Sequence, residues 1–269
     1  MPRRIASRSH RVVKDLRKLR RSSFRDEHGL FIVEGPGLIN EAVRSGAGLK
    51  CMLFTIDRAA QAGLLMEEAA GGREAESYEI GEDLLAWVSD VVTSQGMIGV
   101  FEQVDRPYDD VLAGELTSLL VADQVRDPGN MGSLIRVADA AGADAFLTTP
   151  GSVDLYNPKV VRSSAGSHFH MPLVKDVSFE RLVADMRERG VRTLGLEPRG
   201  GSGYLDEDLV SPHAIVMGNE AFGFSDYEKE MLDGTLHINM PGKAESLNVA
   251  TAAAVVMFEA VRQRHAGKV

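Results

Sequence analysis

Apolar residues along this chain recur with two periods, one typical of strands and one typical of helices. In the first hundred residues, short apolar runs bounded by turn residues predict strands at 30–34, 50–55, 77–80 and 96–101. Helical spacing predicts helices between them at 38–44, 59–69 and 82–88. One more helical stripe precedes the first strand and consists of Val12, Val13, Leu16 and Leu19. Strands that alternate with helices are typical of a compact α/β unit.

The alternation stops in a polar stretch at 104–116 and then restarts. This stretch contains Pro107 and has no clear period, so we interpret it as a linker between a domain at 1–103 and a domain at 117–269. In the second domain the pattern predicts strands at 118–122, 145–148, 191–196, 214–217 and 236–240. Helices are predicted at 131–141, from Asn157 onward, at 179–188, from Ser225 onward, and at the end of the chain. Both domains are therefore predicted to be α/β.

The segment 237–259 is predicted to combine a short strand, a turn with Pro and Gly, and a buried helix. Ser246 and Asn248 are residue types that cap helices, because their side-chain oxygens accept hydrogen bonds from free backbone N–H groups of the first turn. From Val249 to Met257 the residues are almost all apolar, which predicts a helix buried nearly all round. A helix that starts after a strand and a turn is also a place where α/β proteins bind small ligands.

Charge is distributed unevenly over the chain, whose formal net charge is −9. Residues 1–25 hold ten Lys and Arg against the single acid Asp15, so the other 244 residues carry −18. A dense basic segment favours contact with a polyanion such as RNA, because phosphate binding depends on the local density of cations. A solvated, partly disordered basic tail is the alternative on composition alone. The candidate RNA-binding residues in this segment are Arg11, Lys14, Arg17, Lys18, Arg20 and Arg21.

Several functional classes lack their usual signatures in this sequence. No apolar run reaches the ~18 residues of a membrane span, and no apolar stretch follows the basic N-terminus, so we expect a cytoplasmic protein with no membrane partner. The single Cys51 excludes an internal disulfide framework and a multi-cysteine zinc site. His168 and His170 have no acidic or His-rich neighbours, which favours structural roles over a metal site. Motifs for dinucleotide binding and for serine hydrolysis are missing as well.

Three clusters of polar and glycine residues follow predicted strands in the second domain. They are Asn130-x-Gly132-x-x-x-Arg136, then Gly218-Asn219-Glu220-x-x-Gly223-x-Ser225, and then Ile238-x-Met240-x-Gly242-x-x-Glu245-Ser246-Leu247-Asn248-Val249-Ala250. In an open α/β sheet, loops at the carboxyl ends of strands bind the ligand. Each cluster alone is also compatible with an ordinary turn or helix cap.

In order and spacing, these clusters resemble the three motifs of the SpoU, or TrmH-type, RNA 2′-O-ribose methyltransferases of the SPOUT superfamily. The likeness covers residues 118–262. Lys18-Leu19-Arg20, followed by Phe31-Ile32-Val33-Glu34-Gly35, looks like the family's substrate-binding domain, which is similar to a ribosomal protein. The resemblance implies a SPOUT-type parallel sheet with a deep trefoil knot in the C-terminal domain. It also implies a homodimer and S-adenosylmethionine as the cofactor.

The resemblance also assigns individual residues. Cofactor contacts are implied for Leu196, Glu197, Gly218, Asn219, Glu220, Ile238, Met240, Ser246, Leu247 and Asn248. The implied catalytic set is Asn130, Arg136, Glu220, Ser246 and Asn248, and no metal is implied. The chain departs from the family at Asn239, where Pro is usual, and at Phe224, where Leu is common. Both departures are expected to alter loop shape more than chemistry.

The implied reaction is methyl transfer to a ribose 2′-hydroxyl, with an essential arginine. A guanidinium, with a pKa above ~12, is a poor proton acceptor. We therefore interpret Arg136 as a phosphate anchor that orients the 2′-hydroxyl, and count it among the RNA-binding residues. The expected substrate is 23S ribosomal RNA, in a housekeeping or an antibiotic self-resistance role. The alternatives are a transfer-RNA 2′-O-methyltransferase and a non-catalytic RNA-binding protein that keeps the fold.

Overall fold

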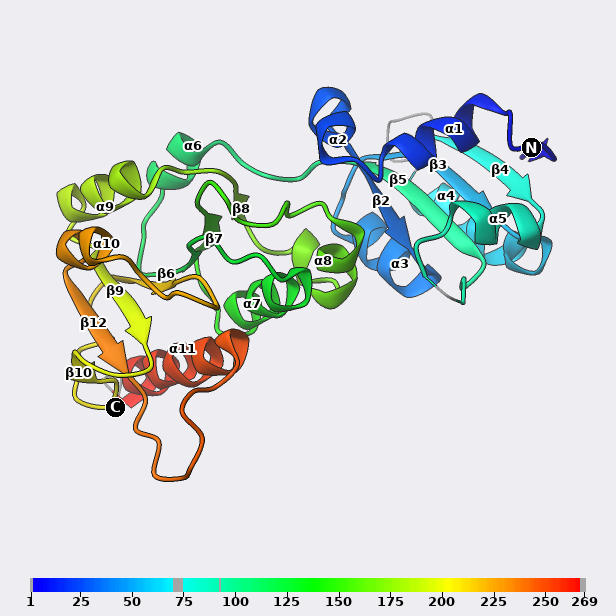
Figure 1. Cartoon of the computed structure of the whole chain (residues 1–269). Coiled ribbons are helices and arrows are strands. Elements are labelled where there is room, and N and C mark those ends of the chain that lie inside the picture. The colour runs from blue at the N-terminus through cyan, green and yellow to red at the C-terminus, as the bar shows by residue number, and fades with distance from the viewer. Residues whose placement is uncertain (1, 70–74, 92, 267–269) are drawn as a thin grey trace. The chain divides into compact units, whose positions relative to one another are not determined.

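The computed structural model describes residues 2–69, 75–91 and 93–266, and the chain divides into two compact units (Figure 1). Unit 1 consists of Met1–Val104 together with Tyr156–Phe169. Unit 2 consists of Asp105–Leu155 together with His170–Val269. The segment Tyr156–Phe169 thus belongs to unit 1, although the chain reaches it only after the first strands of unit 2. The hydrophobic pattern gives no sign of this return.

Unit 1 is built on a five-stranded sheet with the strand order β1-β4-β3-β5-β2. Strand β5 is antiparallel to both of its neighbours, and the other pairs are parallel. The strands are β1 (Arg3–Ile5), β2 (Leu30–Glu34), β3 (Leu49–Phe54), β4 (Glu76–Ile80) and β5 (Met97–Glu102). The helices are α1 (Arg11–Lys18), α2 (Ser22–His28), α3 (Pro36–Arg44), α4 (Ala59–Ala69), α5 (Glu82–Val88) and α8 (Pro158–Ser163), with short 3₁₀ turns η1 (Ile56–Arg58) and η2 (Ser167–Phe169). Strand β2 and helices α4 and α5 have the predicted bounds.

The basic N-terminal segment is folded into unit 1. Strand β1 pairs in parallel with β4 at the edge of the sheet, and α1 buries Val13 and Leu16 in a core cluster that also contains Ile5 and Leu19. The predicted helical stripe is confirmed, and a disordered basic tail is wrong for these residues. Strand β1 and helix α2 were not predicted because each is short and buries a single side chain, Ile5 and Arg25 respectively.

The returning segment of unit 1 packs an aromatic cluster against β2. The rings of Tyr156 and His168 lie 4.8 and 5.6 Å from the ring of Phe31, measured between centroids. His168 is fully buried, and neither of its ring nitrogens has a hydrogen-bond partner among the described residues. Burial lowers the pKa of His168 to about 3, because the imidazolium would lose its hydration there. The ring is therefore neutral at pH 7.

Unit 2 is built on a seven-stranded sheet with the order β10-β12-β9-β11-β6-β7-β8, and all neighbouring strands are parallel. The strands are β6 (Ser118–Ala122), β7 (Ala145–Thr148), β8 (Leu173–Val174), β9 (Arg192–Glu197), β10 (Ser202–Gly203), β11 (His213–Met217) and β12 (Gly234–His237). The helices are α6 (Tyr108–Leu112), α7 (Pro128–Ala140), α9 (Phe179–Glu188), α10 (Asp226–Met231) and α11 (Val249–Ala266). Every residue of β6, β7 and β11 is buried, as expected for parallel strands covered on both faces. The predicted α/β class with a parallel sheet is confirmed.

Two expectations for unit 2 differ from the structure. The stretch 104–116 contains helix α6, and Tyr108 and Leu116 pack in the core of unit 2; the division of the chain at this stretch stays a prediction. Helix α11 is not buried nearly all round, because it packs on α7 and β11 but leaves Phe258 49% exposed. Neither α11 nor any other helix that the structure describes is long and apolar enough to cross a membrane.

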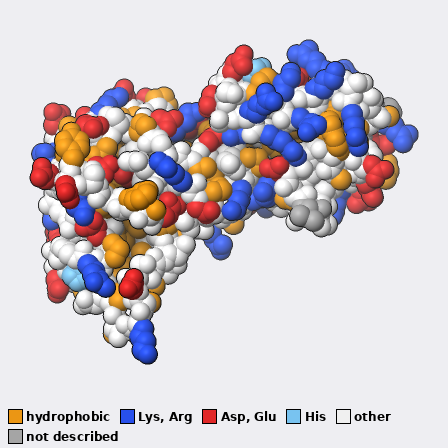
Figure 2. All heavy atoms as spheres, in the orientation of Figure 1, with side chains coloured by type: hydrophobic (Ala, Val, Ile, Leu, Met, Phe, Trp, Pro, Cys, Tyr) orange, Lys and Arg blue, Asp and Glu red, His pale blue; other side chains and the backbone are white. Residues whose placement is uncertain are grey.

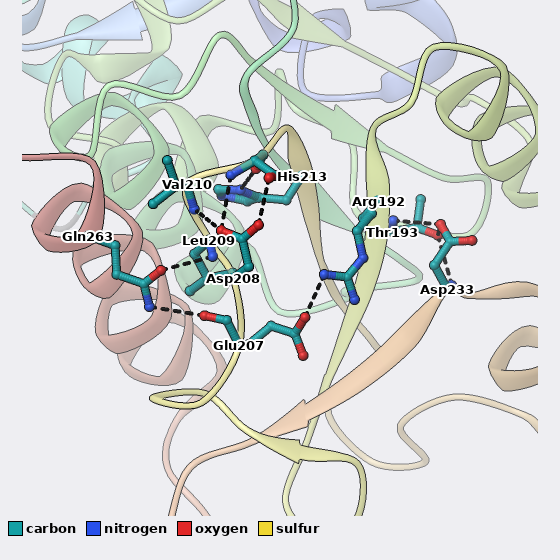
Figure 3. Close-up of polar contacts among 10 residues, drawn as sticks. Arg192, Thr193, Glu207, Asp208, Leu209, Val210, His213, Asp233 and Gln263 are labelled. Carbon is teal, nitrogen blue, oxygen red and sulfur yellow. Dashed lines mark hydrogen bonds and ion pairs between the residues drawn. The ribbon is translucent and has the colours of Figure 1, made fainter. Parts of the chain in front are cut away.

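Polar contacts hold the amino ends of β9 and β12 in place (Figure 3). The carboxylate of Asp233, just before β12, accepts hydrogen bonds from the backbone N–H and the hydroxyl of Thr193 at 2.9 and 2.8 Å. Arg192 pairs with Glu207, whose backbone carbonyl accepts a hydrogen bond of 3.1 Å from Gln263 of α11. These contacts stabilise one end of the sheet, and the pocket described next lies at the other end.

Candidate active site

A pocket of about 460 Å³ opens at the carboxyl ends of the adjacent strands β12, β9 and β11, beside the N-terminus of α11. This volume is typical of small-molecule sites. Asn130, in the first turn of α7, lines the pocket. So do all ten residues predicted to contact a cofactor, namely Leu196, Glu197, Gly218, Asn219, Glu220, Ile238, Met240, Ser246, Leu247 and Asn248. Segments far apart in the sequence thus meet at the sheet edge where α/β proteins bind ligands.

Side-chain amides connect three of these segments. The Oδ1 atom of Asn248 accepts hydrogen bonds from the backbone N–H groups of Ala250 and Thr251, at 3.0 and 3.4 Å, and so caps α11. Its Nδ2 group donates to Oδ1 of Asn130 at 2.8 Å, and Nδ2 of Asn130 donates to the carboxylate of Glu220 at 3.2 Å. Each amide has one orientation that satisfies both of its neighbours. The cap of α11 therefore fixes the direction of a chain of hydrogen bonds, the donor chain, which runs from Asn248 through Asn130 to the carboxylate of Glu220.

Glu220, at the end of this chain, is held as an anion. The backbone N–H groups of Arg126 and Asp127 donate to its two oxygens at 3.2 and 3.1 Å. Partial burial alone would raise the pKa of Glu220, but the hydrogen bonds from its own backbone, from Asn130 and from these two N–H groups outweigh burial and lower the pKa. The pocket rim therefore carries a negative charge at neutral pH.

The loop after β11 takes its shape from Asn219. The Nδ2 group of Asn219 donates to the backbone carbonyl of Gln124 at 2.9 Å, and its Oδ1 atom accepts from the backbone N–H groups of Ala221 and Phe222 at 2.9 and 3.2 Å. Gln124 has a φ of 53°, a left-handed conformation that is uncommon for residues other than glycine and frequent at functional sites. One amide side chain thus joins the strained turn after β6 to the loop after β11.

Phe224, at the position where the resemblance leads us to expect Leu, fits because two glycines lie against its ring. A Cβ atom added at Gly195 would come within 3.0 Å of the ring, and one added at Gly218 within 3.1 Å. Phe224 itself belongs to the buried core of unit 2. The larger ring therefore supports the start of the loop after β11 from within the core, without lining the pocket.

Arg136 and Ser246 occupy different places from the rest of the predicted catalytic set. Arg136 is exposed on α7 and does not line the pocket. It follows Asn130 by six residues, and because a helix turns by ~100° per residue, the two side chains leave α7 about 120° apart. Ser246 lines the pocket but does not cap α11, since Asn248 takes that position.

Sequence reasoning missed some residues that shape the pocket. Asp127 caps α7 by accepting a hydrogen bond of 2.8 Å from the backbone N–H of Asn130. The signal was available, because Asp followed by Pro is typical of a helix start. Three further lining residues stand in the motifs without an assigned role, namely Gly223, Glu245 and Val249, and the lining residues that the motifs do not specify are Pro198, Met217, Ala221, Phe222 and Ala252. All of them are close in sequence to predicted positions.

The described lining of the pocket is acidic. It contains Glu197, Glu220 and Glu245 and no Lys, Arg or His. Glu197 pairs with Lys229 of α10 at 2.7 Å, so part of this charge is balanced from outside the pocket. An acidic lining favours a cationic ligand and disfavours phosphate groups. Within the residues that the structure describes, no group of three or more His, Cys, Asp or Glu is placed to hold a metal ion.

A basic groove lies on unit 1, over which many Lys and Arg side chains gather (Figure 2). Its volume is about 400 Å³, and its lining consists of Ser9, Arg11, Lys14, Asp15, Lys18, Phe24 and His28. The rings of Phe24 and His28 stack with 3.9 Å between centroids, and the ammonium of Lys18 lies 5.3 Å from the centroid of Phe24. Cations beside aromatic rings are the combination that binds single-stranded nucleic acids.

The other candidate RNA-binding residues of this segment differ in their contacts. The guanidinium of Arg17 lies 4.1 Å from the ring centroid of Trp87, a cation–π contact that keeps the charge at the surface. Arg20 instead donates to the backbone carbonyl of Val88 at 3.0 Å and holds the end of α5. Arg21, at the start of α2, is exposed.

This architecture defines a class of α/β protein that has a ligand pocket at the carboxyl ends of parallel strands and a second, smaller unit with a basic groove. The chain belongs to the SpoU rRNA Methylase family, which matches residues 117–258. Residues 10–99 match the MRM3-like substrate binding domain. The resemblance seen in the three motifs is confirmed.

The similarity to known proteins extends over nearly the whole chain. The 23S rRNA (guanosine(2553)-2′-O)-methyltransferase RlmP of Bacillus subtilis is 32% identical over 254 residues, which cover 94% of this chain and 97% of the relative. The AdoMet-bound rRNA methyltransferase from Sinorhizobium meliloti has a TM-score of 0.86 at 29% identity, covering 97% of this chain and 98% of that chain. The SpoU methyltransferase AviRb from Streptomyces viridochromogenes, in complex with AdoMet, has a TM-score of 0.84 at 30% identity, covering 95% and 98%.

Proposed function

We propose that this protein transfers a methyl group from S-adenosylmethionine to a ribose 2′-hydroxyl of ribosomal RNA, with 23S rRNA as the substrate. The observation that carries the proposal is the donor chain from Asn248 through Asn130 to Glu220, on the rim of a pocket lined by every residue that the resemblance assigns to the cofactor. Family membership and the names of full-length relatives support the reaction and the RNA class.

The pocket suits S-adenosylmethionine in size and in charge. This cofactor carries a sulfonium, an ammonium and one carboxylate, and its net positive charge matches the acidic lining of Glu197, Glu220 and Glu245. Apolar side chains such as Leu196 and Ile238 would hold its uncharged parts. The bound cofactor supplies a methyl group activated by the positive sulfonium. The protein has to align the 2′-hydroxyl oxygen with this methyl group.

The proposed catalytic residues are Asn130, Arg136, Glu220, Ser246 and Asn248. The side-chain amide of Asn248, which caps α11, donates a hydrogen bond to Asn130, and Asn130 in turn donates one to Glu220, so the groups that face the ribose are preorganised before RNA arrives. Arg136 anchors a substrate phosphate through its planar guanidinium and thereby positions the 2′-hydroxyl. The hydroxyl proton leaves late, to a substrate phosphate or to water.

A homodimer and a trefoil knot in the C-terminal domain are part of this proposal. Two observations support the dimer. Phe258 on α11 is a large apolar side chain that a second copy would cover. Arg136 lies outside the pocket of its own chain, so a second copy whose α7 lies at the pocket rim would supply this side chain. With ribosomal RNA as the substrate, we place the reaction in the cytoplasm.

The basic groove of unit 1 is the proposed handle for RNA. Arg11, Lys14 and Lys18 line the groove, and Arg17 and Arg21 are exposed near it in sequence. These cations would position the RNA backbone without reading its sequence. Arg20 belongs to the fold of unit 1 and contributes to RNA binding only through its charge.

Incubation with methyl-labelled S-adenosylmethionine and protein-free 23S rRNA, followed by nuclease mapping, tests the proposed function. Label on one ribose 2′-oxygen is expected, and the Glu220→Ala variant should transfer much less. Transfer RNA in a parallel reaction is the control, and label on it alone would contradict the substrate. Cofactor binding in calorimetry without label on any RNA would contradict catalysis and favour a non-catalytic RNA-binding protein.

A further inference from the structure

Phe222 is the large apolar side chain with the greatest exposed fraction in the described chain, at 86%. It lines the rim of the pocket, two residues after Glu220. Leu247 lines the same pocket and is 38% exposed. A phenyl ring left in water forgoes the free energy that burial would provide. A second molecule that covers this ring is therefore favoured.

The exposure of Phe222 comes from a loop that is held in one conformation. The backbone N–H of Phe222 donates to Oδ1 of Asn219 at 3.2 Å, and the N–H of Gly223 donates to the carbonyl of Asn219 at 2.9 Å. Asn219 is itself held by its hydrogen bond to the carbonyl of Gln124. The ring is thus presented outward by a fixed backbone, so ordering it for binding costs little conformational entropy.

The surroundings of Phe222 select the kind of group that covers it. The pocket lining contains three carboxylates and no Lys, Arg or His among its described residues, so the lining itself offers no contact to a phosphate group, which the proposed Arg136 of a second copy would anchor instead. An aromatic face in a lining without Lys, Arg or His suits the uncharged π face of a nucleobase. The polar side chains of Asn130, Glu220 and Asn248 lie in the same lining, where the ribose would have to be placed.

We infer that Phe222 is a stacking platform for the base of the target nucleotide. The base lies against the phenyl ring outside the stack of the RNA, and its ribose 2′-hydroxyl then faces the polar rim. Base–aromatic stacking depends little on base identity. The platform therefore positions the nucleoside, and the choice of the target nucleotide depends on other protein–RNA contacts. This inference rests on the proposed methyl transfer to RNA.

The test compares variants in steady-state methyl transfer to the mapped RNA at RNA concentrations below KM. Phe222→Ala should lower kcat/KM by about 5- to 150-fold, which is the ~1–3 kcal/mol of one stacked base. Phe222→Trp should keep most activity, and Phe222→Leu should resemble the alanine variant. Tyr227→Ala removes an aromatic side chain that is 58% exposed on α10 outside the pocket lining, and it should match the parent.

A second measurement isolates the base. An RNA that lacks only the target base but keeps its ribose should be a poorer substrate for the parent, and the same change should cost the Phe222→Ala variant little, because the two changes remove one contact. Additive losses would overturn the inference. A loss of cofactor affinity in Phe222→Ala equal to its loss in kcat/KM would also overturn the inference, because the ring would then bind the cofactor. Dissociation of the dimer in Phe222→Ala, measured by sedimentation, would overturn it too, because the ring would then contact a second copy. Failure of the parent to methylate RNA would instead refute the proposed function.

Discussion

The side-chain amides of Asn130 and Asn248, 118 residues apart in the sequence, are joined by a hydrogen bond of 2.8 Å. One atom of Asn248 caps a helix while the other orients a residue of the pocket, so the two roles can be separated by substitution. Asn248→Asp keeps an oxygen for the cap, and its charge suits a helix N-terminus. It loses the donor to Asn130. We expect Asn248→Asp to retain the parent's free energy of unfolding and to lose methyl-transfer activity.

Asn248→Ala is the matched variant, because it removes the cap as well. Its free energy of unfolding should fall by about 1 kcal/mol, the usual cost of losing an N-cap side chain. Urea unfolding and single-turnover transfer measured on both variants check these outcomes. If Asn248→Asp transfers methyl groups at the parent's rate, the donor chain to Glu220 has no part in alignment.

Arg136 should act through charge and shape, not as a base. Loss of one preorganised charged contact lowers the rate by about 10²–10³, or ~3–4 kcal/mol, so Arg136→Ala should lose most activity. Arg136→Lys keeps a charge without the planar fork and should keep a small fraction. In single-turnover assays the lysine variant should show the parent's pH profile at reduced height. A new rise in activity near the reference lysine pKa of ~10.4 would identify residue 136 as the proton acceptor.

The cations of the basic groove should set the salt dependence of RNA binding. Deleting residues 1–21 cannot test this, because it would remove β1 and the core residues Val13 and Leu16. The double variant Arg11→Gln, Lys14→Gln leaves the core intact. It should bind RNA more weakly, with a log–log salt slope smaller by roughly 1.4 to 1.8. Fluorescence of Trp87, the chain's single tryptophan, offers a direct titration signal because Arg17 lies over its ring. An unchanged slope would exclude both residues as phosphate contacts.

Arg20→Gln is the control for that series. Its guanidinium is bound to backbone carbonyls at the end of α5, so this variant should lower the stability of unit 1 more than the double variant does.

The buried His168 should lower the free energy of unfolding of unit 1 at acidic pH. Its folded pKa of about 3 lies below the ~6.5 of an unfolded histidine. The unfolded chain therefore binds more protons between these values, and stability falls as pH drops below ~6.5. His168→Phe should remove this loss, so the free energy of unfolding of the variant, relative to that of the parent, should rise as the pH is lowered from 7 to 5. Unfolding followed by Trp87 fluorescence measures it. A difference independent of pH would show that the ring is not buried as a neutral group.

Asp123 should have the opposite pH dependence in unit 2. It is buried at the end of β6 and accepts a hydrogen bond of 2.6 Å from the hydroxyl of Thr149. Burial, more than any other influence, raises its pKa to about 6. The folded state binds the proton more tightly than the unfolded state, so stability falls as pH rises from ~4 through ~6.

Asp123→Asn cannot ionise, so its free energy of unfolding relative to the parent should increase over this range by about 3 kcal/mol, at ~1.4 kcal/mol per pKa unit. Circular dichroism during urea unfolding at several pH values measures the difference. A decrease with rising pH would contradict the assigned direction.

Most of the pocket could be predicted from the sequence because its residues sit in motifs whose spacing is local, at strand ends and at a helix cap. Arg136 shows where that reasoning stops. The motif places Arg136 six residues after Asn130 on the same helix, but the rotation of the helix points the two side chains in different directions. The apolar run of α11 predicted burial nearly all round, whereas the helix packs on α7 and β11 and leaves Phe258 exposed. Phe222 could not be found from a pattern, because its exposure depends on how Asn219 folds the loop.

The return of Tyr156–Phe169 to unit 1 was equally hidden, because hydrophobic periods predict elements and not which sheet an element joins. Contacts in the folded chain reveal it, such as those of Tyr156 and His168 with Phe31.

That return constrains how genes for such proteins can recombine. A crossover near residue 104 would exchange β2 between two parents but leave the segment 156–169 behind. Phe31 from one parent would then meet Tyr156 and His168 from the other, inside a core where mismatched volumes are costly. Functional chimeras should therefore arise where the two segments are inherited from the same parent. Substitutions at these contacting positions should occur together in related proteins, even though more than a hundred residues separate the positions in the sequence.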